Sequence, residues 1–137
     1  MQKLNLYLVV TIILLGAGCS GTTQSKAGLR SNAKGFISVK GKTNDRQEPT
    51  SFWVNINKDN ESWQAGEIGS TSEVFITKSG KYIYNPIPTG ATLLQSANGK
   101  TNIAQLTGFN PATAKEADTG RFYSEEKART GTWTVIK

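Results

Sequence analysis

From Gly35 onward, the chain alternates short segments rich in β-branched and aromatic residues with clusters of turn-forming residues. Segments of this length and composition favour strands, because a helix needs a longer stretch with a period of about 3.6 residues. Phe52, Val54 and Ile56 alternate with mostly polar neighbours, which is typical of a strand with one buried face. Strands are predicted at residues 36–40, 52–57, 73–78, 81–85, 91–97, 100–106 and 132–136.

Two dipeptides predict hairpins between neighbouring strands. Asn98-Gly99 favours a type I′ turn, because both central residues of that turn take positive φ. This turn would place Leu94 opposite Ile103. Ser79-Gly80 lies in the same way between two predicted strands, so a second two-residue turn is predicted there.

The second hairpin brings a set of aromatic and basic side chains together. Because side chains alternate along a strand, Phe75, Tyr82 and Tyr84 would share one face, and Lys78 and Lys81 would lie opposite each other at the tip. Exposed, these five residues would form a binding face for a glycan or a partner protein. The alternative is that the hairpin is central and the aromatic side chains belong to the core.

Two later segments favour short helical turns. Asn110-Pro111 supplies a cap and a first-turn proline for a turn reaching Ala117. Residues 124–131 begin with a serine and two acids and end with basic residues and a glycine, which also suits a helical turn. The predicted fold is therefore mostly β: a small antiparallel β-sandwich or barrel with one or two short helical turns near the C-terminus.

The first residues have the layout of a signal peptide. A head with Lys3 is followed by an apolar run from Leu4 to Leu15 and by the small residues Gly16-Ala17-Gly18, directly before the one cysteine, Cys19. The run is shorter than the ~20 apolar residues that a spanning helix needs, which favours cleavage over a retained anchor. An ordinary secretory peptide with a chance cysteine is the alternative.

This segment resembles the leader of bacterial lipoproteins, in which a lipobox of leucine and small residues precedes a lipidated cysteine. Here the leucine, Leu15, stands one position earlier than in the family pattern. The resemblance covers residues 1–20 and implies that Cys19 is acylated and becomes the mature N-terminus. Ser20, following the cysteine, implies sorting to the outer membrane, with the domain in the periplasm or at the cell surface.

This organisation predicts three parts. Residues 1–18 form the signal peptide, residues 19–34 the lipidated cysteine and a flexible tether, and residues 35–137 a single β-rich domain. The domain is long enough to bury a core without disulfides.

Composition excludes several kinds of chemistry. The chain has no histidine, which rules out serine–histidine triads and histidine-ligated metals. With Cys19 acylated it also has no free thiol. No cofactor and no metal site are therefore predicted. Without Lys3, the surplus of basic over acidic residues falls from six to five, which favours an anionic glycan or lipid as a further partner. Nucleic acid is not expected for an exported chain.

The predicted function is that of a non-enzymatic binding or structural component of a cell-envelope assembly, held at the membrane through Cys19 and bound to an envelope protein. The first alternative is an inhibitor or immunity lipoprotein that blocks an envelope-directed enzyme or toxin. The second is a carboxylate-based glycan hydrolase using Glu67 and Glu73, or Asp59 and Glu61, as an acid/base pair. Solvated loop charges account for the same carboxylates without catalysis.

Overall fold

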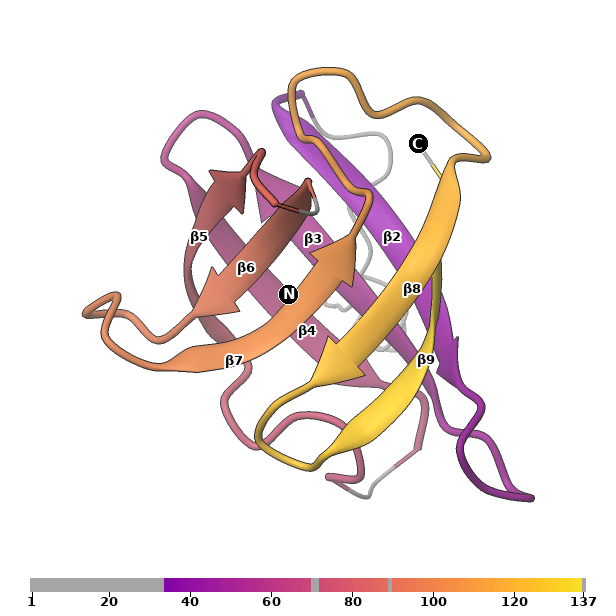
Figure 1. Cartoon of the computed structure of the whole chain (residues 1–137). Helices are drawn as coiled ribbons and strands as arrows, with labels where there is room; N and C mark the ends of the chain where they lie inside the picture. The colour runs from indigo at the N-terminus through magenta and orange to yellow at the C-terminus, as the bar shows by residue number, and fades with distance from the viewer. Residues whose placement is uncertain (1–33, 70–71, 89, 137) are drawn as a thin grey trace, which may run out of the picture.

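The strands form a closed antiparallel barrel in which each strand pairs with the next along the chain and β9 pairs with β2 (Figure 1). The computed structural model describes residues 34–69, 72–88 and 90–136. The predicted signal peptide, Cys19 and nearly all of the predicted tether lie outside these residues. The strands are β2 (Phe36–Thr43), β3 (Ser51–Asn57), β4 (Ser62–Glu67), β5 (Ser79–Asn85), β6 (Ala91–Gln95), β7 (Asn102–Thr107), β8 (Thr119–Ser124) and β9 (Arg129–Val135).

The barrel, and not the sandwich, is the arrangement that the structure shows. Closure gives every strand a neighbour on both sides, although β4 and β5 pair over three residues only. Five of the seven predicted strands coincide with β2, β3, β5, β6 and β7, and the predicted strand at 132–136 is the second half of β9. The prediction missed β4 and β8, because Gly66 and Gly120 interrupt their short apolar patterns.

The predicted helical turns are wrong. The described part of the chain contains no helix, and therefore none that could cross a membrane. Residues 124–131 instead form the end of β8, a tight turn and the start of β9, where Ser124 pairs with Arg129. Residues 110–117 form a loop with isolated turns. The charge order of a helical turn is present, but cross-strand pairing along β8 and β9 outweighs this local preference.

The predicted hairpin at Asn98-Gly99 is present, with a different register. Gly99 takes a φ of 73° and donates its N–H to the carbonyl of Ser96, at 2.8 Å. Gln95 pairs with Asn102, as the two-residue turn predicts, but Leu94 pairs with Ala104 and not with Ile103, because an irregularity between Leu94 and Gln95 shifts the register by one residue. Turn type alone therefore did not determine which residues face each other.

Alternate residues of each strand fill the barrel interior. Along β9 the burial alternates at every residue, so that Trp133 and Val135 face inward while Thr132 and Thr134 face solvent. On β2 the inward position between Val39 and Thr43 is Gly41, where a Cβ atom would lie 2.1 Å from Cζ of Phe52. The core ring of Phe52 occupies the space that any larger residue there would need.

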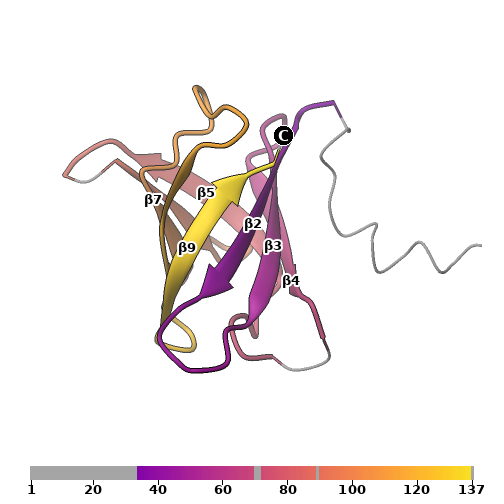
Figure 2. The same cartoon turned by 90° about the vertical axis from the view of Figure 1, so that its right-hand side faces the viewer.

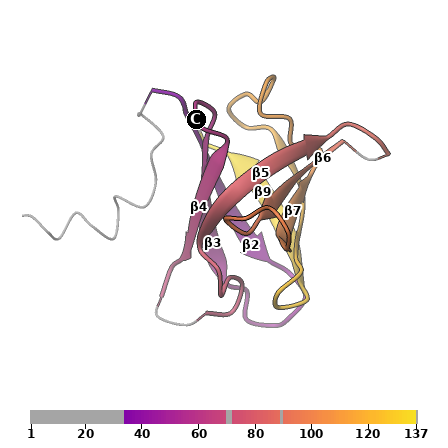
Figure 3. The same ribbon diagram turned by 90° about the vertical axis from the view of Figure 1, so that its left-hand side faces the viewer.

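Connections close both ends of the barrel, as the two side views show (Figures 2 and 3). At one end Val74 and Phe75 of the β4–β5 connection are fully buried, and the Phe75 ring centre lies 5.6 Å from that of Phe52. At the other end Phe109 of the β7–β8 loop packs edge-on against Trp133, with ring centres 5.4 Å apart. Side chains thus fill the interior, as in other eight-stranded barrels of this size.

Candidate binding site

The five residues predicted as one binding face do not come together, because the hairpin at Ser79-Gly80 does not form. Residues 73–78 are not a strand, and β5 begins at Ser79 and pairs with β4 and β6. Phe75 lies in the core. Lys78 belongs to the β4–β5 connection, and Lys81 has Ser62 and Gln95 as its cross-strand neighbours.

Tyr82 and Tyr84 are the two predicted residues that share a surface feature. They lie on β5 with their cross-strand partners Leu94 and Thr92, both of which are buried. Tyr82 is half-buried and packs against the core. These two tyrosines therefore stay candidates for a binding face, and the groups around them determine what such a face could bind.

The carboxylates of Glu67 and Glu126 hold the β4–β5 connection in the barrel end. Glu67 accepts hydrogen bonds from the backbone N–H groups of Glu73, Val74 and Phe75, at 2.8, 3.2 and 3.1 Å. Glu126 accepts from the backbone N–H groups of Ile76 and Thr77, at 2.9 and 3.0 Å. These bonds satisfy consecutive backbone N–H groups that, in a strand, would bond to a neighbouring strand.

A buried arginine joins this connection to the rest of the barrel. Arg129 is 1% exposed, and its Nε donates to both carboxylate oxygens of Asp45, at 2.9 and 3.0 Å. Nη1 donates to Glu73 at 3.2 Å, and Nη2 donates to the hydroxyl of Thr43 at 2.8 Å. Arg46 also pairs with Glu73, at 3.1 Å. All three guanidinium nitrogens therefore have acceptors, as a buried charge requires.

The environment of Asp45 favours its ionised form. Burial raises the pKa of this carboxyl, but the hydrogen bonds from Arg129 and from backbone N–H groups, together with the Arg129 charge, outweigh burial and lower the pKa below 3.8. The candidate acid/base residue Glu73 is thus part of a structural ion-pair network, and Glu67 is a backbone acceptor. Asp59 and Glu61 lie in the exposed β3–β4 turn.

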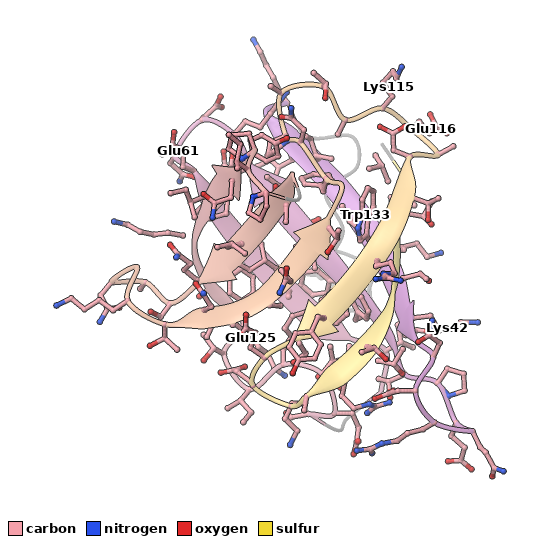
Figure 4. All side chains as sticks on the ribbon, viewed as in Figure 1. Lys42, Glu61, Lys115, Glu116, Glu125 and Trp133 are labelled. Carbon is pink, nitrogen blue, oxygen red and sulfur yellow. The ribbon has the colours of Figure 1, made fainter. Side chains whose placement is uncertain are left out.

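A groove of about 370 Å³ lies along Tyr82 and Tyr84 at the barrel end that carries the β7–β8 loop. One wall is the outer part of β5 and the other is the β7–β8 loop, and the β3–β4 turn borders one end, where Figure 4 labels Glu61. Its lining combines aromatic, aliphatic, amide and charged groups. The lining residues are Lys58, Glu61, Tyr82, Ile83, Tyr84, Asn110, Pro111 and Ala112.

Local hydrogen bonds hold both walls of this groove. The Asn110 side chain accepts from the N–H of Ala112 at 2.9 Å, and its carbonyl accepts from Ala114 at 2.9 Å. Across the groove, the carbonyl of Glu61 accepts from the N–H of Tyr82 at 3.1 Å. Glu61 has a φ of 55°, a conformation that costs a non-glycine residue energy and is enriched at functional positions.

The Tyr82 hydroxyl is a hydrogen-bond donor at neutral pH, as a tyrosine with an ordinary pKa also is. Burial, and then the negative charge of Glu61, raise the pKa of Tyr82 further. Lys58 and Glu61 provide one charge of each sign at the rim.

The groove has an exposed aliphatic residue in its lining. Ile83 is 48% exposed beside its cross-strand neighbour Leu93, and Ile87 in the β5–β6 loop, outside the groove lining, is 80% exposed. An apolar centre with tyrosines and a charged rim is the composition of protein–protein contact sites. The sequence pattern missed the second wall, because Pro111 was interpreted as the start of a helical turn and nothing local indicates that it lies beside Tyr84.

Comparisons with protein-family models, curated proteins and solved structures give no match to this chain. Among residues 34–69, 72–88 and 90–136, no three acidic, histidine or cysteine side chains lie close enough to hold a metal ion. The groups that line the groove beside Tyr82 can form hydrogen bonds, bury apolar surface and pair charges.

Proposed function

We propose that this chain is a lipid-anchored, non-enzymatic binding protein of the bacterial cell envelope, which engages a partner protein through the groove between β5 and the β7–β8 loop. The observation that carries this proposal is the groove itself, in which residues of β5, Tyr82, Ile83 and Tyr84, and the hydrogen-bonded loop at Pro111 form the two walls. Side chains fill the barrel interior, so contact with a partner takes place on the outer surface.

The anchor belongs to the same proposal and is supported by residues 1–20. An apolar run, small residues and Cys19 follow one another as in lipoprotein leaders. Acyl chains contribute about 0.8 kcal/mol per buried methylene, so several chains on one residue hold a domain firmly at a membrane. Ser20 supports the outer membrane as the destination, with the domain in the periplasm or at the surface.

Replacing the cysteine tests the anchor. The Cys19→Ala variant is expected to lose fatty-acid labelling and to accumulate as uncleaved precursor, because the acylated side chain would be missing. Metabolic labelling with a radioactive fatty acid and the apparent mass on a gel measure both effects. Unaltered maturation would instead indicate an ordinary secretory leader.

Site-specific photocrosslinking in cells tests the groove. A photoreactive side chain at Ile83 is expected to capture a protein partner, whereas the same group at Thr101, in the β6–β7 loop, serves as the matched control. Adding Ala112→Asp to the Ile83 probe should reduce the yield about tenfold, because a charge on the facing wall opposes burial. Equal capture from both positions, or no capture from Ile83, would contradict the proposal.

The identity of the captured protein separates the two binding roles. A component of an envelope complex whose assembly fails without this chain supports the proposed role. A captured hydrolase or toxin that loses activity in a one-to-one complex would assign the inhibitor role to the same groove.

A further inference from the structure

The outer surface of β8, β9, β2 and β3 carries basic and hydroxyl side chains in regular rows, on the side of the barrel seen in Figure 2. Arg121 on β8 pairs with Thr132 on β9, which pairs with Lys42 on β2, which pairs with Ser51 on β3. In the next row, Thr134, Lys40 and Trp53 are neighbours. This surface, defined by Arg121, Thr132, Thr134, Lys40, Lys42 and Ser51, is called the basic face below.

The positive charges of the basic face lie close enough to act on one ligand. Lys40 and Lys42 are two residues apart on the same side of β2, a spacing of about 7 Å. Arg121 and Lys42 are separated by one intervening strand, which places their backbones about 10 Å apart. All three side chains are exposed, and Lys42 points away from the barrel in Figure 4.

Acidic side chains do not neutralise this charge within the four described strands. The outward positions of β8, β9, β2 and β3 hold hydroxyl, amide, aromatic and basic residues and neither aspartate nor glutamate. Of the carboxylates at the nearby barrel end, Asp45 and Glu73 pair with Arg129, Glu67 accepts from backbone N–H groups, and Glu48 is exposed in the β2–β3 loop. With three cations and no carboxylate among the outward positions of the four strands, the field directly above the basic face is positive.

A groove of about 490 Å³ runs over the basic face between β9, β2 and β3. Hydroxyl groups of Ser51, Thr132 and Thr134 lie along it with the two lysines, and Ile68, 69% exposed, borders it. Beside Lys40, the ring of Trp53 lies over Gly66, where a Cβ atom would come within 2.4 Å of the ring. The indole thus lies along the sheet surface over β4, one strand away from Lys40.

We infer that the basic face binds an anionic polysaccharide. The two ammonium groups and the guanidinium pair with carboxylate, sulfate or phosphate groups spaced along the chain, the threonine and serine hydroxyls exchange hydrogen bonds with sugar hydroxyls, and Trp53 offers an aromatic surface to the C–H face of a ring. The hydroxyl groups of Ser51, Thr132 and Thr134 lie between and beside the cations and match the hydroxyl groups of a sugar chain, which favours a polysaccharide over a lipid leaflet. This inference is independent of the proposed protein-binding groove, which is lined by other residues.

Binding of the full chain, purified in detergent micelles, to immobilised polygalacturonate tests the inference, with uncharged dextran as the reference. The Lys40→Gln, Lys42→Gln, Arg121→Gln triple variant is expected to weaken binding to polygalacturonate about tenfold or more, because it removes all three cations of the face. The matched control replaces Lys78, Lys81 and Lys100, which are exposed elsewhere, by glutamine and changes the net charge equally. It should weaken binding less than about threefold.

A second pair of changes separates a built site from general attraction. Thr132→Val with Thr134→Val leaves the charge unchanged and is expected to weaken polygalacturonate binding about threefold, because two hydroxyl partners are lost. Circular dichroism checks that each variant folds. If the triple variant does not fold, the single Lys42→Gln variant replaces it, with an expected loss of binding of about threefold.

The inference is overturned by any of three results. The first is an equal loss of polygalacturonate binding in the two triple variants. The second is no binding of the wild type to polygalacturonate. The third is binding of the wild type to phosphatidylglycerol vesicles, lost in the Lys40, Lys42, Arg121 variant, while polygalacturonate does not bind. Photocrosslinking from Ile83 should be unaffected by the triple variant, so the failure of either proposal is recognised separately.

Discussion

At the scale of single residues, Arg129 shows how a charged side chain becomes part of a barrel core. It occupies an inward position at the start of β9, where an apolar residue would be expected from the alternation. Thr43 and Asp45, at the end of β2 and the start of the β2–β3 loop, and Glu73 of the β4–β5 connection surround its guanidinium. Arg129 therefore links β9, the β2–β3 loop and the β4–β5 connection at one end of the barrel.

Asp45 makes the stability of this end dependent on pH. Because the pKa of Asp45 is lowered in the folded state, its contribution to the free energy of unfolding is present above the unfolded pKa, about 3.9, and is lost as the pH falls through the folded value. The Asp45→Asn variant should be less stable than the wild type by about 1–2 kcal/mol at pH 7, and the difference should shrink in strong acid. Urea unfolding across the acid range measures it.

A neighbouring carboxylate serves as the control for this prediction. Glu48 is an exposed residue of the same loop, and Glu48→Gln should follow the wild type at every pH. A difference between Asp45→Asn and the wild type that stays constant down to pH 2 would show that charge at Asp45 is not the cause.

At the scale of elements, the β4–β5 connection departs most from the strand conformation that its residues favour. Its residues have β-forming composition, yet their backbone N–H groups are bound by the carboxylates of Glu67 and Glu126 while Val74 and Phe75 enter the core. The hydroxyl of Ser124 adds a bond to the carbonyl of Val74, at 2.6 Å. Burial of two apolar side chains at an otherwise open barrel end explains why the loop replaces the hairpin.

Weakening the Glu67 acceptor should loosen this connection without dissolving the barrel. In Glu67→Gln the charge-assisted bonds to Glu73, Val74 and Phe75 become neutral or are lost, so stability should fall by about 1–2 kcal/mol. Hydrogen exchange of these amides should accelerate more than exchange in β2 and β3. Glu125→Gln, at an exposed position of the β8–β9 turn, is the control, and equal acceleration in both variants would argue against the role of Glu67.

At the scale of the whole molecule, one continuous core runs through the barrel from the β4–β5 connection to the β7–β8 loop. Phe75, Phe52 and Phe122 form an aromatic cluster, with ring centres 4.3 to 5.7 Å apart. Phe109 and Trp133 form a second contact at the opposite end. Side chains therefore pack the interior from one end of the barrel to the other.

Removing the Phe75 side chain from the core should destabilise the entire domain. Phe75→Ala removes a fully buried ring and should lower the free energy of unfolding by about 3–5 kcal/mol, because neighbouring side chains fill such a cavity only in part. Ile83→Ala, at a half-exposed position, should cost less than about 1 kcal/mol. Urea unfolding compares the two, and similar losses would contradict the assignment of Phe75 to the core and Ile83 to the surface.

The sequence by itself determined the class of the fold and the chemistry that the domain lacks. The period of two in segments such as 52–57 and the turn at Asn98-Gly99 are local signals, because they depend on neighbouring residues alone. The absence of histidine likewise needs no structure to exclude histidine-based catalysis. One candidate pair, Tyr82 and Tyr84, was placed on β5 by the same alternation.

Tertiary structure decided the features that depend on contacts distant in sequence. Pairing between β2 and β9 closes the sheet. Residues 73–78 do not form a strand, because Glu67 and Glu126 bind their backbone N–H groups and the core has room for Val74 and Phe75. The groove beside Tyr84 and the basic face arise in the same way, since each combines strands or loops that closure brings together. Local patterns specify which side of a strand is buried, but the partner across it is selected by the packing of the whole barrel.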